Sequence, residues 1–147
     1  MRYRETGQLH PTFHDSVRFA LDYLADHYGE EGMAAVVKAN ALEVHHSLKE
    51  RLDQGDPTEL LSHWIYYLGR EKAPYRISVE PDRIVIEVLE CPAIRFLRRG
   101  GRPVSPNLCR CTRLTNEFWC EGGPFEATLE ILEEGHCRQV FARRPAP

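Results

Sequence analysis

The 147-residue sequence predicts an α+β protein in which N-terminal helices pack on one face of an antiparallel sheet of about four strands, built from two hairpins. The first observation behind this is the helical spacing of apolar residues through the N-terminal half. The second is a switch to strict alternation of apolar and polar residues after residue 75. The third is that no repeat or linker divides the chain, so a single domain over residues 1–147 is expected.

Three helices are expected in the N-terminal half, over residues 13–28, 33–52 and 57–69. Gly29 and Gly32 interrupt the apolar stripe between the first two helices. Asp56 is suited to cap the third helix, and Pro57 fits its first turn. Residues 1–11 are polar and are expected to form a loose arm.

Two hairpins are expected after these helices, with strands over residues 75–79, 84–88, 125–131 and 136–142. The dipeptide Cys91-Pro92 follows the first hairpin and leads into a loop over residues 98–106. A helix is expected between the hairpins, over residues 107–121, and a disordered tail over residues 143–147.

Composition excludes several classes of function. The net charge is -3 and the pI about 6.2, so there is no basic excess to neutralise phosphates, and no nucleic-acid partner is expected. No apolar run approaches the ~20 residues that span a bilayer, and the N-terminus lacks the apolar segment of a signal peptide. The sequence therefore predicts a cytoplasmic protein without a membrane partner.

The five cysteines are odd in number, and in reducing surroundings a disulfide framework is not expected. The thiols are then core residues, metal ligands or reactive groups. A zinc site would have to gather Cys91, Cys109, Cys111 and Cys137, but one close pair and two single cysteines fit the usual paired spacing poorly. No cofactor is therefore the main expectation, and zinc is the alternative.

A helical wheel separates the cysteines of the expected helix 107–121. Cys111 shares a face with apolar residues and is expected in the core, whereas Cys109 lies with polar residues near the helix N-terminus, where the helix dipole favours its thiolate. On the last strand, Cys137 is expected to point inward. Gln139 then becomes a buried or cavity-lining amide that needs hydrogen-bond partners, and His136 points the opposite way.

Other polar and aromatic residues leave alternatives open. Asn40 interrupts the apolar stripe of the second helix, as a satisfied core amide or as a contact to a ligand, and His45 lies at the edge of that stripe. His14 and His63 are expected at the surface. An aromatic helix face could be core, the wall of a pocket or the contact of a homo-oligomer: Trp64, Tyr66 and Tyr67.

A family resemblance rests on three features in order: a helical N-terminal half, a hairpin followed by Cys91-Pro92 with a cysteine in the next helix, and Gly-x-Cys-x-x-x-Phe from Gly135 to Phe141. The chain resembles the L-2-amino-thiazoline-4-carboxylic acid hydrolase family and, more distantly, vinyl-reductase-like small-molecule-binding domains. The resemblance implies a hydrolase that opens a small cyclic amidine at a carbon-nitrogen bond and releases an N-carbamoyl amino acid. The positions that match the family's cysteines are Cys91, Cys109 and Cys137.

Two functional hypotheses follow from the sequence. In a hydrolase, Cys109 or Cys137 would be the nucleophile or a pocket thiol, with His45 as the base. The residues expected to bind substrate are Cys91, Asn40, Arg113 and Asn116, with Arg113 as the cation for a substrate carboxylate. The second hypothesis is a non-catalytic module that binds or senses a small molecule. Both require that thiols far apart in the chain meet at one cavity.

Overall fold

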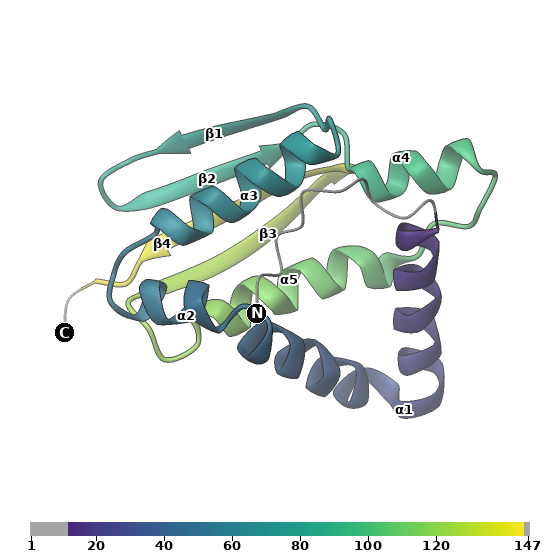
Figure 1. Ribbon diagram of the computed structural model, residues 1–147, viewed down its shortest axis with the longest axis horizontal. Coiled ribbons are helices and arrows are strands. Elements are labelled where there is room, and N and C mark those ends of the chain that lie inside the picture. Colours follow the sequence, from purple (N-terminus) through teal and green to yellow (C-terminus); the bar gives the residue numbers. More distant parts are fainter. Residues whose placement is uncertain (1–11, 146–147) are drawn as a thin grey trace.

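The computed structural model describes residues 12–145, so the loose arm expected over residues 1–11 lies outside the described residues. The described chain forms an α+β fold, as predicted (Figure 1). Its elements are, in order, α1 (Phe13–Glu43), α2 (His46–Asp53), α3 (Thr58–Arg70), β1 (Tyr75–Val79), β2 (Arg83–Val88), α4 (Pro92–Arg99), α5 (Pro106–Cys120), β3 (Phe125–Glu133) and β4 (His136–Arg143).

The sheet has four strands in the order β1-β2-β4-β3, and every neighbouring pair is antiparallel. The two predicted hairpins are β1–β2 and β3–β4, and they join through β2 and β4. Alternation places Ile84 and Ile86 of β2 and Phe141 of β4 on one face, where all three are buried. The apolar half of the alternating pattern therefore becomes the inner face of the sheet.

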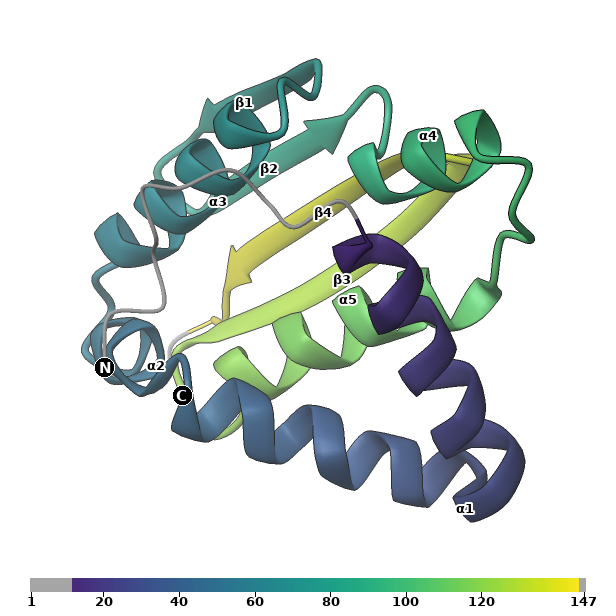
Figure 2. The same ribbon diagram turned by 45° about the vertical axis from the view of Figure 1, so that its right-hand side comes forward.

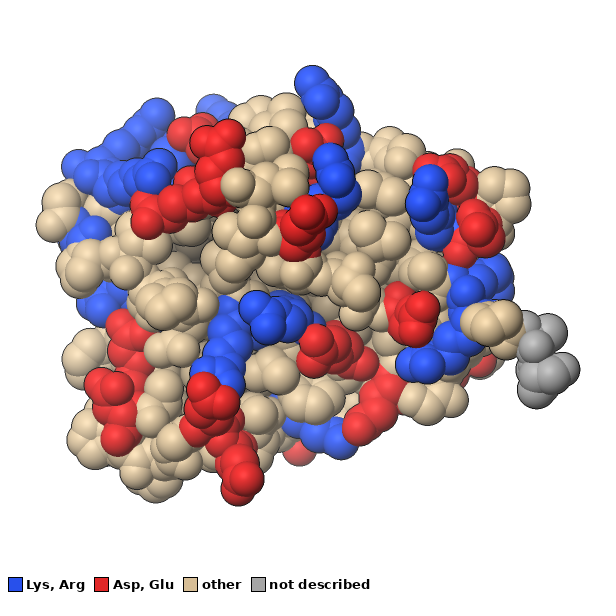
Figure 3. All heavy atoms as spheres, turned by 180° about the vertical axis from the view of Figure 1, so that it is seen from behind, with Lys and Arg blue, Asp and Glu red and all other residues tan. Residues whose placement is uncertain are grey.

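The outer face of the sheet carries charged residues in matched register. Arg76 lies opposite Glu87, Glu87 opposite Arg138, and Arg138 opposite Glu130. The side chains of these three pairs come within 3.8, 4.0 and 3.5 Å of each other. Figure 3 shows acidic and basic side chains intermingled on the molecule seen from behind. Such a face is suited to water, and the helices cover only the inner one.

Helices α3 and α5 lie over the inner face (Figures 1 and 2). Trp64 and Leu68 of α3 and Trp119 of α5 belong to the same core cluster as the buried residues of β2 and β4. Asp56 accepts hydrogen bonds from the backbone N–H and the hydroxyl of Thr58 at 2.9 and 2.6 Å, as its predicted capping role requires, but α3 begins at Thr58 and Pro57 precedes its first turn. The two helices and the sheet thus form the core layers.

Helix α1 is bent at Gly29, which has φ 67° and ψ -175°. This left-handed backbone suits glycine, and the break predicted at Gly29 is confirmed. The second predicted helix, 33–52, is wrong as a single element, because the chain turns at Val44 and His45 before α2 begins. Apolar residues on both sides of this turn are buried in one core, so their spacing does not reveal it: Ala41, Leu48 and Leu52.

Helix α4 was not predicted. Cys91 precedes it in an extended conformation, and Pro92 occupies its first turn, where its fixed φ fits and no N–H is needed. Ile94 and Leu97 anchor the helix by burial. The disordered tail expected over residues 143–147 is wrong for its first two residues, since residue 143 ends β4 and the N–H of Arg144 donates to the carbonyl of Pro124 at 2.8 Å, while residues 146–147 lie outside the described range.

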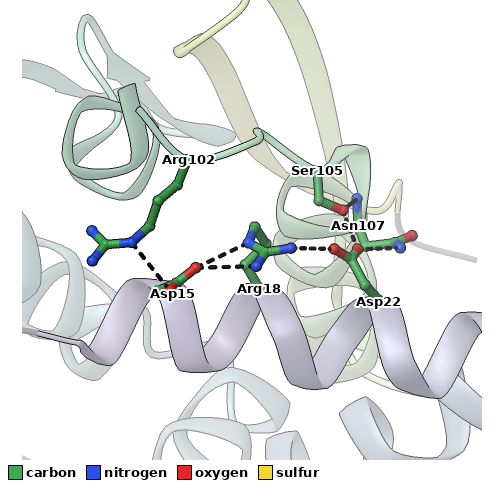
Figure 4. Close-up of polar contacts among 6 residues, drawn as sticks. All are labelled: Asp15, Arg18, Asp22, Arg102, Ser105 and Asn107. Carbon is green, nitrogen blue, oxygen red and sulfur yellow. Dashed lines mark hydrogen bonds and ion pairs between the residues drawn. The ribbon is translucent and has the colours of Figure 1, made fainter. Parts of the chain in front are cut away.

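A polar contact fixes the first half of α1 to the start of α5 (Figure 4). Asp22 accepts hydrogen bonds from the Ser105 hydroxyl, from Asn107 Nδ2 at 3.0 Å and from Arg18 at 2.9 Å. Ser105 in turn caps α5 by accepting from the Asn107 N–H at 3.1 Å. We call these four residues the Asp22 clip. Burial alone would raise the pKa of Asp22, but the hydrogen bonds from Ser105, Asn107 and Arg18 outweigh it and hold the pKa below its usual value.

Candidate functional site

A cavity of about 570 Å³ lies between the helices and the inner face of the sheet. Its wall is formed by helices α1, α3 and α5, by the β2–α4 junction, and by strands β3 and β4. The volume lies within the range of pockets that bind small molecules. Val36 and Asn40 line the cavity and are also exposed to solvent, so they mark its mouth on the side of α1.

Four of the cysteines line this cavity, although they are far apart in the chain. Cys137 lies opposite Val88 in the β2–β4 register, and the N–H of Cys91 donates to the carbonyl of Gly135 at 2.6 Å, which brings the β3–β4 turn against the start of α4. Cys109 reaches the cavity from the first turns of α5. The structure therefore gathers the thiols as both functional hypotheses require. Cys120, in contrast, is buried in the core.

The thiols around the cavity are not activated. Burial raises the pKa of Cys137 to about 12 and also raises the pKa of Cys91, Cys109 and Cys111. The expectation that the helix dipole favours a Cys109 thiolate is wrong, because loss of hydration outweighs it and Arg113 offsets only part of the rise. At neutral pH these thiols are protonated.

Cys91 lies where backbone donors partly oppose the effect of burial on its thiol. Burial is the main influence on its pKa and raises it. The backbone N–H groups of Ala93 and Ile94, at the start of α4, act in the opposite direction. Donors of this kind at a helix N-terminus stabilise negative charge on sulfur.

Five aromatic rings form a second part of the wall, which we call the aromatic cluster: His45, His63, Trp64, Tyr67 and Trp119. The ring centroids of His45 and His63 lie 5.1 and 5.2 Å from that of Trp119. The turn that ends α1 at residue 44 is what brings His45 into this cluster. Burial raises the pKa of Tyr67 above its usual value.

Several expectations for these aromatic and histidine residues are wrong. His63 is not at the surface, because its ring stacks on Tyr67 at 6.2 Å within the aromatic cluster. His14 is buried and lies 3.3 Å from Glu71. Trp64 and Tyr67 line the cavity, so for these two residues the alternative of a pocket wall is confirmed.

A buried amide pair completes the wall. Asn116 and Gln139 are each only 1% exposed, and Asn116 Nδ2 donates to Gln139 Oε1 at 2.6 Å. The Gln139 side chain also hydrogen-bonds to Cys137. Among the described residues nothing donates to Asn116 Oδ1, and Trp64 Nε1 and Trp119 Nε1 likewise have no partner. None of these three atoms reaches water, so each carries the cost of a buried polar group.

The remaining predicted site residues divide between the cavity and the surface. Asn40 lines the cavity, but it is exposed at the mouth and is not a core amide. Arg113 is exposed on α5 and is not part of the lining, so it is not placed to hold a carboxylate inside the cavity. His136 points away from Cys137 to the outer face, as expected, and pairs with Glu87 at 3.0 Å.

Charged and metal-binding groups are sparse at this site. The described lining contains no Lys or Arg, and Glu133 is its one carboxylate. Within residues 12–145 no group of three or more His, Cys, Asp or Glu side chains is arranged to hold a metal ion. In the same range, no helix is sufficiently long and apolar to cross a membrane.

Sequence reasoning missed two residues that shape the site. Trp119 is not among the predicted site residues, and His63 was expected at the surface. A signal for both was present, since Trp, Tyr and His cluster near residues 63–67 and at residue 119, but only the tertiary fold shows that these segments meet.

Fold and site together define a class: an α+β protein with a largely apolar cavity between its helices and sheet, lined by thiols, aromatic rings and a buried amide pair. No protein-family model matches the chain, and a search of curated proteins finds no match.

Proposed function

We propose that the protein binds a small organic molecule in the cavity between α1 and the sheet. The observation that carries this proposal is the cavity itself: about 570 Å³ of space, open at Val36 and Asn40 and walled mostly by apolar and aromatic side chains. A few convergent polar groups in an otherwise apolar pocket are typical of ligand sites. A cytoplasmic location, which suits five free thiols, is part of the proposal.

Binding without catalysis is favoured over thiol chemistry by the state of the cysteines. A thiol nucleophile has to be available as thiolate at the working pH. Burial raises the pKa of each cavity cysteine, and for Cys137 the value is about 12. The sulfur atoms therefore serve as polarisable, apolar wall.

The test is binding of the uncharged dye N-phenyl-1-naphthylamine, whose fluorescence rises in apolar surroundings. The wild-type protein should bind it with a stoichiometry of one. Cys109→Trp fills the cavity and should abolish binding, whereas Arg113→Trp, one turn along α5 on its exposed side, should leave binding unchanged. Both variants are checked for folding by circular dichroism. Equal dye binding by wild type and Cys109→Trp would contradict the proposal.

A second candidate function is the thiol-dependent hydrolysis of a cyclic amidine, in line with the family resemblance. The observation that favours it is Cys91, whose sulfur is near the N–H groups at the start of α4. In this mechanism the Cys91 sulfur attacks the amidine carbon, the ring carbon-nitrogen bond breaks, and the thiol proton passes to the leaving ring nitrogen. Water then displaces the sulfur from the resulting thioimidate, which releases the open-chain product and restores the thiol. Formation of a ring-opened product that is lost in Cys91→Ala and kept in Cys120→Ala, a cysteine outside the cavity, would support it.

A further inference from the structure

We propose that the outer face of the first half of α1 is a docking surface for an arginine-rich segment of a partner protein. The surface consists of four neighbouring aromatic side chains, which we call the α1 aromatic strip: Phe19, Tyr23, His27 and Tyr28. Figure 1 shows this half of α1 at one end of the molecule. None of the four side chains lines the cavity, so the proposal is independent of ligand binding there.

The α1 aromatic strip is both exposed and continuous. The side chains of Phe19, Tyr23 and Tyr28 are 64%, 44% and 63% exposed. The ring centroids of Phe19 and Tyr28 lie 6.5 and 6.3 Å from that of Tyr23. His27 stacks on Tyr23 at 4.0 Å, and its Nδ1 lies 3.0 Å from the carbonyl oxygen of Tyr23. Single exposed aromatic residues are common, but a contiguous group of them is typical of an interaction site.

The charge around the α1 aromatic strip favours a basic partner. Residues 13–31 contain five carboxylates and one arginine, and the arginine is already paired with two acids of the same helix. Two of the carboxylates, Asp26 and Glu31, have no ion-pair partner among residues 12–145. Asp26 is three positions after Tyr23, so the two side chains are neighbours on the helix surface. The strip therefore combines exposed rings with unpaired negative charge.

Arginine is the side chain that matches both features. Its planar guanidinium stacks on aromatic faces, is always charged, and pairs with carboxylates through two N–H donors. It is also more weakly hydrated than the ammonium group of lysine, so stacking on a ring costs it less hydration. An arginine can thus lie on Tyr23 or Tyr28 while it pairs with Asp26 or Glu31.

The same charges disfavour the other occupants of an exposed aromatic face. A second copy of the chain would bring the carboxylates of one α1 against those of the other, and like charges repel. A membrane surface is anionic, and helices that lie on it carry Lys and Arg beside their apolar residues. The first half of α1 has the opposite sign.

The test measures binding of fluorescein-labelled nona-arginine and nona-lysine to the full chain by fluorescence anisotropy. We expect nona-arginine to bind about threefold or more tightly than nona-lysine, because only the guanidinium stacks well. The double variant Phe19→Ser/Tyr28→Ser should weaken nona-arginine about five- to thirtyfold, as for two exposed cation–π contacts. Ile65→Ser, which removes an equally exposed apolar side chain from α3, should change binding less than twofold. Circular dichroism checks that each variant is folded.

A second pair of variants separates this surface from the net charge of the protein. Asp26→Asn/Glu31→Gln should weaken nona-arginine about two- to tenfold at low salt, as for two exposed ion pairs. Glu50→Gln/Glu117→Gln removes the same charge from exposed positions of α2 and α5 and should change binding less than twofold.

Equal effects of these two double variants, or equal binding of nona-arginine to wild type and Phe19→Ser/Tyr28→Ser, would overturn the proposal. Two further measurements address the other occupants. Binding of the protein to phosphatidylserine vesicles, or a dimer in sedimentation that Phe19→Ser/Tyr28→Ser abolishes, would overturn it in favour of a membrane or of a second copy.

Discussion

Cys137 should react with iodoacetamide about three orders of magnitude more slowly in the native protein at pH 8 than an exposed cysteine does. Its pKa is about 12, because it is buried beside the cavity. About one part in ten thousand is then thiolate at pH 8, whereas about a quarter of a cysteine with an unperturbed pKa of ~8.5 is ionised. Only the thiolate reacts, so the ratio of these populations sets the ratio of rates.

The assay follows alkylation of each cysteine-containing peptide by mass spectrometry, in native protein and in urea. The unfolded chain is the internal control, since its cysteines have lost their burial. Between pH 7 and 10 the native rate at Cys137 should rise about tenfold per pH unit, because the thiolate population grows in that proportion below the pKa. If native Cys137 is labelled at pH 7.5 within a factor of ten of the unfolded chain, the reasoning is refuted and a thiolate mechanism becomes the better proposal.

Other predictions concern stability. Asp22→Ala removes the acceptor of the Asp22 clip and should lower the free energy of unfolding by about 2–3 kcal/mol in urea titrations, whereas Asp26→Ala, on an exposed turn of the same helix, should change it by less than about 0.5 kcal/mol. Gly29→Ala should cost about 1–3 kcal/mol at its positive φ, but Gly69→Ala, in open space within α3, should stabilise slightly; equal effects would contradict the assigned kink. Stability should fall as pH rises above ~8.5, because Cys120 has a pKa of about 12 when folded and its proton is lost first from the unfolded chain; Cys120→Ala should flatten that part of the pH profile.

The sequence was sufficient for the parts of the fold that depend on local periodicity. Alternation located both hairpins, and the glycine at position 29 located the bend in α1. It failed where one core spans a break, since the turn at residues 44–45 leaves the apolar spacing intact. It also failed at α4, an eight-residue helix too short for its period to be distinguished from a loop rich in arginine.

The sequence predicted which residues meet at the cavity, but not how the fold changes the pKa of its thiols. The convergence of Cys91, Cys109 and Cys137 could be anticipated, and Gln139 was expected to need a partner. The sign of the Cys109 pKa shift could not be anticipated, because the helix dipole and the loss of hydration act in opposite directions and only the second depends on the tertiary fold. The exposure of Arg113 also depends on the tertiary fold. The helical wheel placed this residue on the same face as residues that line the cavity. Its long side chain nevertheless extends into water.

The coincidence of empty space with unpartnered polar atoms distinguishes this cavity from a packing defect. A dry void is tolerated when its wall is apolar, whereas each buried polar atom without a partner costs about 1–3 kcal/mol. Three such atoms belong to side chains that line the cavity: those of Trp64, Asn116 and Trp119. The free energy of unfolding of a domain is about 5–15 kcal/mol, so the summed cost of three such atoms is a large fraction of it. Apolar replacements at these positions would remove this cost, so packing alone does not account for the polar atoms in this wall.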